Sequence, residues 1–212
     1  MRCMRRCYVH LAIPFLLWLS PPAPTTAESL APQSTPEISV FVYGFPGLDR
    51  WVVEGAEAEA NRIFRQARIQ LKWTNCLSEV AAPALCYGRQ RSGELVLRFT
   101  SKAPPSVSAK ALGAALFSPV GDSALVFYRR ISLLPTNAPV HIMLGRVLAH
   151  EIAHLLLPNE KHSSFGLMRA DWVWDDLRFV CTTCLRLEPD LIQHMQQAVR
   201  RRGLAEHDKT GK

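Results

Sequence analysis

The residues most suited to chemistry are two histidines four positions apart, with a glutamate directly after the first: His150-Glu151-Ile152-Ala153-His154. Residues four apart on a helix project from the same face, so both imidazoles can bind one metal ion. Glu151 lies about 100° further around such a helix, where its carboxylate can reach a metal-bound water without occupying a ligand position. The pattern therefore predicts a zinc site in which the metal lowers the pKa of that water and Glu151 is the general base.

A catalytic zinc site needs a third protein ligand and one open position. Two candidates for this ligand follow the motif closely, His162 and Glu160. Later acids in the chain provide further candidates: Asp171, Asp175 and Asp176. If Glu160 and His162 both bound the ion, the site would be closed and the zinc would serve only to stabilise the fold.

Periodicity of the apolar residues indicates the elements that carry this motif. Alternation predicts strands at 38–45, 69–74, 94–100, 112–118 and 123–130. Spacings of three and four predict helices at 48–67, at 137–157 and at 189–202. Asn137 is the expected cap of the second helix, with Pro139 in its first turn. The strand–helix–strand beginning favours a parallel pair joined by a crossover helix, and 75–93 reads as a loop.

Composition excludes several classes of protein. The chain has 212 residues, 48% of them hydrophobic and 20% charged, with a formal net charge of +7. These values are typical of a globular protein and exclude a disordered chain and a multi-span membrane protein. Three of the arginines lie in the first six residues, so the rest of the chain is only mildly basic and no nucleic-acid partner is expected.

The N-terminus has the pattern of a secretory signal. Arg2, Arg5 and Arg6 precede the short apolar stretch 11–19, and small residues end at Ala27. We expect cleavage near Ala27, a flexible lead-in at 28–37, and a secreted or periplasmic mature chain without stable insertion in a membrane. The remainder, 38–212, is predicted to be a single domain.

Cysteine usage agrees with export. Six cysteines are present, and those beyond the signal are Cys76, Cys86, Cys181 and Cys184. An even number in an exported chain favours two disulfides, with the local pairs Cys76–Cys86 and Cys181–Cys184 as the preferred connectivity. A structural zinc site made by all four thiolates, or a redox role for the C-x-x-C pair, are the alternatives.

Taken together, the motif and the residues after it resemble the metzincin clan of zinc peptidases, especially its matrixin-like branch. The matching residues are His150, Glu151, His154, His162-Ser163 and Gly166-Leu167-Met168. The resemblance implies that His162 is the third ligand and that Met168 lies in a tight turn beneath the metal. The family usually places five residues between the second and third histidines, whereas this chain has seven, at 155–161. The later C-x-x-C is also similar to that of archaemetzincins.

This resemblance implies an α/β (α+β) fold with a twisted mixed sheet over a long zinc-binding helix. An upper subdomain, 38–157, would lie above a short lower subdomain, 158–212, that ends in a helix. The implied function is a monomeric zinc endopeptidase whose peptide or protein substrate pairs with an edge strand, for which 114–117 is the candidate. The alternative is a catalytically silent zinc-containing binding or structural module of the same fold.

Overall fold

The computed structural model describes residues 35–45, 47–77, 82–88, 90–91, 93–119, 121–158, 161–169 and 185–210, with side chains placed up to 204. The predicted signal at 1–27 and most of the lead-in lie outside the described residues. The same holds for Glu160, for the later acids Asp171, Asp175 and Asp176, and for Cys181 and Cys184. The expected disulfide between those two cysteines therefore stays a prediction.

Five strands form one mixed sheet in the order β2-β1-β3-β5-β4. Their bounds are β1 Glu37–Tyr43, β2 Gln70–Cys76, β3 Leu95–Thr100, β4 Gly113–Leu116 and β5 Ser123–Phe127. β1 pairs in parallel with β2 and with β3, and β3 pairs in parallel with β5. The expected parallel pair with a crossover helix is confirmed. β4 alone runs antiparallel, against β5, and lies at the edge of the sheet.

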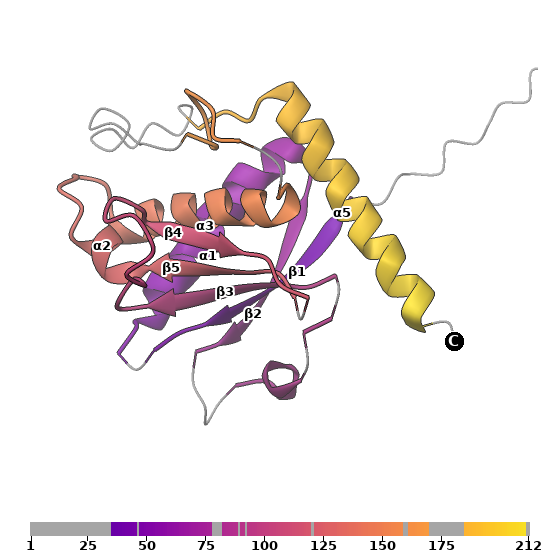
Figure 1. Cartoon of the computed structure of the whole chain (residues 1–212), viewed down its shortest axis with the longest axis horizontal. Helices are drawn as coiled ribbons and strands as arrows, with labels where there is room; N and C mark the ends of the chain where they lie inside the picture. The colour runs from indigo at the N-terminus through magenta and orange to yellow at the C-terminus, as the bar shows by residue number, and fades with distance from the viewer. Residues whose placement is uncertain are drawn as a thin grey trace, which may run out of the picture. The chain divides into compact units, whose positions relative to one another are not determined.

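Helices lie at the three ranges that the apolar spacing predicted, and a short additional helix follows the last strand (Figure 1). Their bounds are α1 Arg50–Phe64, α2 Tyr128–Ser132, α3 Val140–Leu156 and α5 Pro189–Thr210, with short 3-10 turns η1 Arg65–Ala67 and η2 Ala84–Tyr87. Within the described part of the chain, no helix combines the length and the apolar character needed to cross a membrane.

Three details of the predicted elements were wrong. Residues 128–130 belong to α2 rather than to the last strand, because the chain turns back there and Arg130 donates hydrogen bonds to the carbonyls of Ser108 and Ala111. Asn137 does not cap α3: Pro139 is the capping residue, without a side-chain bond. The last helix continues beyond 202 to Thr210.

The main core lies between one face of the sheet and the two helices α1 and α3. Strand β1 shows the alternation, since Ile38, Val40 and Val42 belong to this core while Phe41 lies in a second, smaller cluster. The smaller cluster includes the disulfide between Cys76 and Cys86. This bridge ties the loop after β2 to the sheet, so both faces of the sheet are partly covered.

Helices α1 and α3 touch backbone to backbone at Gly145. A Cβ atom there would lie 2.5 Å from the carbonyl oxygen of Ala56, so only glycine allows this approach. Beside it, the buried Arg146 of α3 forms an ion pair with the buried Glu59 of α1, with 3.6 Å between Nε and Oε1. On an α-helix, positions 150 and 154 lie about 140° and about 180° around from position 145. The histidine face of α3 therefore points away from α1.

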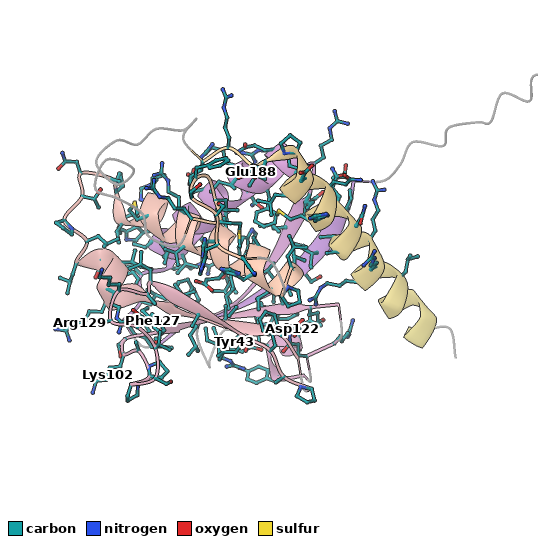
Figure 2. The ribbon with its side chains drawn as sticks, turned by 45° about the horizontal axis from the view of Figure 1, so that its top comes forward. Tyr43, Lys102, Asp122, Phe127, Arg129 and Glu188 are labelled. Atoms are coloured by element: carbon teal, nitrogen blue, oxygen red, sulfur yellow. A yellow bond between two sulfur atoms is a disulfide. The ribbon has the colours of Figure 1, made fainter. Side chains whose placement is uncertain are left out.

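The C-terminal helix holds the end of α3. Arg202 of α5 donates from Nη2 to the carbonyl oxygen of Leu155, at 2.8 Å, and to Oδ2 of Asp122, at 2.6 Å. Asp122 directly precedes β5 and is labelled in Figure 2. Leu155 is in the last turn of α3, where carbonyls lack partners within the helix and a cation is favourable. One guanidinium thus joins α5, α3 and the sheet.

We predict that Arg202→Gln lowers the free energy of unfolding by about 1–2 kcal/mol, because hydrogen bonds to charged groups contribute this much when partly exposed. Urea unfolding followed by circular dichroism measures the change. Arg201→Gln, on the exposed side of the same helix, is the matched control and should leave stability nearly unchanged. Equal losses in the two variants would contradict the assigned role of Arg202.

Candidate metal centre

Helix α3 supplies two of the site's imidazoles from one face. His150 and His154 lie one turn apart and are both partly buried, with ring centroids 4.6 Å apart. Their Nε2 atoms are 3.0 Å apart. The helix is buried on most of its other sides, so it acts as a rigid core element that presents both rings from fixed positions.

The third imidazole comes from the segment after α3. Gly166, at φ +72°, bends this segment into a turn that the backbone hydrogen bond from Ser163 to Met168 closes at 2.8 Å. The turn places Nε2 of His162 at 3.0 Å from Nε2 of His154. Ligand atoms of the three histidines all lie within 4.8 Å of one another. In Figure 1 this segment, in orange, lies on the side of α3 away from the sheet.

The turn also fixes the tautomer of the first histidine. Nδ1 of His150 lies 2.7 Å from the carbonyl oxygen of Leu167, and a carbonyl can only accept, so Nδ1 carries the proton. The Nε2 atom of the neutral ring then keeps its lone pair and faces the other two histidines. Such an outer hydrogen bond is what orients a metal-binding imidazole.

The donor set fits a zinc ion. Tetrahedral zinc with Zn–N distances of about 2.0–2.1 Å requires nitrogen atoms roughly 3.3 Å apart, close to the 3.0 Å spacings found here. Burial, together with the neighbouring His150 and His162, lowers the pKa of His154 to about 4. Burial also lowers the pKa of His150, against the raising effect of the Leu167 carbonyl. Both rings are therefore neutral at neutral pH, as metal binding demands.

Glu151 is buried next to this group and carries an oxygen with no polar partner. Its side chain is only 4% exposed, and Oε2 has no hydrogen bond among the described residues. Burial raises the pKa of this carboxyl group to about 8. A cation bound nearby would favour the ionised form instead. A buried carboxylate with a free acceptor is poised to take a proton from a molecule that enters the site.

Strand β4 forms the wall against which Glu151 rests. A Cβ atom at Gly113 would lie 2.3 Å from Oε1 of Glu151, so the carboxylate packs directly on the backbone of the edge strand. This contact joins the motif helix to the strand that the sequence suggested for substrate pairing. Neither it nor the His150–Leu167 hydrogen bond could be inferred from the sequence, because a glycine and a backbone carbonyl carry no distinctive signal.

The structure brings together His150, Glu151, His154 and His162. Met168 is buried in the main core, and its backbone oxygen closes the turn that bears His162. Its assignment as the residue beneath the metal stays a prediction, as does the alternative ligand Glu160, which lies outside the described residues. Phe165, in the same turn, is exposed.

Comparison with known proteins identifies a similar fold. No family model and no curated protein matches the sequence. Among solved structures, that of archaemetzincin from Methanopyrus kandleri is similar, with a TM-score of 0.51 and 17% identity. The match covers 81% of this chain and 100% of that chain. At this identity the likeness concerns the fold alone, and it agrees with the predicted mixed α/β architecture, which the structure confirms.

The two candidate third ligands can be separated by substitution. We predict that His162→Ala weakens Zn²⁺ binding by more than 100-fold, since even the loss of an outer hydrogen-bonding partner costs about 10–100-fold. Glu160→Ala should bind Zn²⁺ like the wild type, and so should His194→Ala, an exposed histidine on α5. Competition titration with a zinc-chelating dye measures the affinities. Loss of affinity in Glu160→Ala alone would assign the ligand to Glu160.

Proposed function

We propose that this chain is a secreted or periplasmic zinc-dependent endopeptidase of the metzincin type, close to its matrixin-like branch. The observation that carries the proposal is the convergence of three imidazole Nε2 atoms beside a buried carboxylate with a free oxygen. The similarity in fold to archaemetzincin supports the same chemistry. The Cys76–Cys86 disulfide favours an oxidising compartment.

The proposed roles follow from the positions of the side chains. His150, His154 and His162 would hold the zinc ion, and Met168 would support the turn beneath it. Zinc bound there would polarise the scissile carbonyl and lower the pKa of a water molecule. Glu151 accepts a proton from the attacking water at its free carboxylate oxygen and delivers it to the nitrogen of the leaving amine. Because Glu151 is buried against β4, that transfer takes place out of contact with bulk solvent.

A peptide is the substrate class that suits the edge of this sheet. β4 is an edge strand, and no other described strand pairs with its outer side. An extended peptide can add to such a strand through backbone hydrogen bonds. Gly113 would then align its scissile bond with Glu151, which packs on that residue. We propose a monomer that cleaves peptides or proteins, with no nucleic-acid partner.

We predict that Glu151→Gln lowers the cleavage of a mixed peptide library by on the order of 10²–10⁴-fold, because the amide keeps the volume but cannot accept the proton. Mass spectrometry identifies the cut sites, and metal analysis verifies equal zinc content. Glu54→Gln, at an exposed glutamate of α1, is the control and should retain full activity. A folded, zinc-bearing wild type without glutamate-dependent cuts would favour the silent zinc-containing module.

The glycine contact provides a second test. We predict that Gly113→Ala lowers peptide cleavage by at least tenfold while the protein still binds zinc, because the added methyl group displaces the Glu151 carboxylate. Gly88→Ala is the matched substitution, since a Cβ there would meet its nearest neighbour, the Leu85 carbonyl oxygen, at an ordinary van der Waals distance of 3.6 Å. Unchanged cleavage in Gly113→Ala would show that the position of Glu151 against β4 has no part in catalysis.

A further inference from the structure

The two edges of the sheet differ in how they are protected. Edge strands usually carry charges, prolines or bulges that prevent another strand from pairing with them. β2, at one edge, has the exposed Lys72 in its middle, paired with Glu37 of β1. β4, at the other edge, reads Gly113-Ala114-Ala115-Leu116 and contains no charge and no proline. The edge that carries neither charge nor proline is the one that borders the metal centre.

Two large apolar side chains stand exposed at the far end of that edge. Leu116 is 44% exposed and the next residue, Phe117, is 49% exposed. Gly113 faces α3, and Ala115 packs against the main core on the same side. Because side chains alternate along a strand, Leu116 points to the opposite face of the sheet. Leu116 therefore does not complete the core, and Phe117, which lies just beyond the end of β4, is exposed as well.

The spacing of residues along β4 defines the distance from Leu116 to Glu151. Gly113 packs on Glu151, and Leu116 lies three residues further, at about 3.4 Å per residue or roughly 10 Å away. Antiparallel pairing is slightly more stable than parallel pairing. A peptide that adds antiparallel to β4 has the residues before its scissile bond opposite Leu116.

We propose that the substrate of this site is an extended peptide segment with a large apolar side chain about three residues before the cleaved bond. Leu116 and Phe117 contact that side chain, and the free edge of β4 binds its backbone. The inference rests on the proposed peptidase function and adds to it the class of sequence that is cleaved. A contact between apolar side chains of this size is expected to raise kcat/KM roughly tenfold.

The test uses peptides that differ only at the third residue before the cut site, with Phe, Leu or Ser there. The wild type should cleave the Phe and Leu peptides with kcat/KM at least about tenfold above the Ser peptide. In the double variant Leu116→Ser/Phe117→Ser, this ratio should fall to near one. Leu204→Ser, at an exposed leucine of α5, is the control and should retain the wild-type ratio.

The possible outcomes distinguish this inference from the proposed peptidase function on which it rests. Glutamate-dependent cleavage without a preference at that position would overturn the inference alone, and so would a preference that survives in the double variant. A preference confined to residues after the cut would overturn the antiparallel register, and with it the proposal. If no peptide is cleaved in a Glu151-dependent way, the peptidase function fails and the inference fails with it.

Discussion

Helix α3 approaches α1 so closely at Gly145 that no side chain fits between them, and the rest of the site depends on this contact. The carbonyl of Ala56 occupies the space that a Cβ atom would need. The buried pair of Arg146 and Glu59 lies next to it, and the loss of one partner of such a pair costs about 3–5 kcal/mol. Together the two contacts set the rotation of α3. With that rotation fixed, the histidine face is directed away from α1 and toward the turn that bears His162.

The site is assembled from groups that are each unfavourable to bury alone. Burial keeps His150 and His154 neutral, which suits metal ligands, and leaves the free oxygen of Glu151 without a partner. An unpartnered buried acceptor costs free energy, so its persistence beside three convergent imidazoles points to a function and not to packing. The surrounding fold compensates for this cost. Arg202 secures the end of α3, and the 163–169 turn holds His150 through the Leu167 carbonyl.

The sheet contributes an edge as well as a core. Its helix-covered face carries the apolar side chains that support α3, and its antiparallel strand β4 brings a bare backbone against Glu151. The Glu151 carboxylate and the strand edge to which a peptide could add are thus adjacent at Gly113. A side chain at that position would separate the carboxylate from the strand. The geometry of the proposed peptidase therefore requires a glycine that takes no part in the chemistry itself.

The sequence by itself determined the parts whose signal is local. The i, i+4 spacing of His150 and His154 specified a helical metal-binding face, and apolar alternation specified the strands, because helical and strand periodicity depend only on the chain within a few residues. The Cys76–Cys86 pairing was also predicted from proximity in the sequence. Residues 128–130 were expected in a strand but belong to α2. This could not be predicted, because it depends on hydrogen bonds from Arg130 to a loop some twenty residues earlier.

Only the tertiary structure decided what depends on contacts between distant segments. It set His162 within reach of the two helical histidines, seated Glu151 on Gly113, and joined Arg202 to Leu155. It also set the antiparallel pairing of β4 with β5, which leaves Leu116 and Phe117 exposed. Side-chain type can mark His162 as a candidate ligand, but the contacts themselves form only when the sheet, α1 and α3 pack as one core.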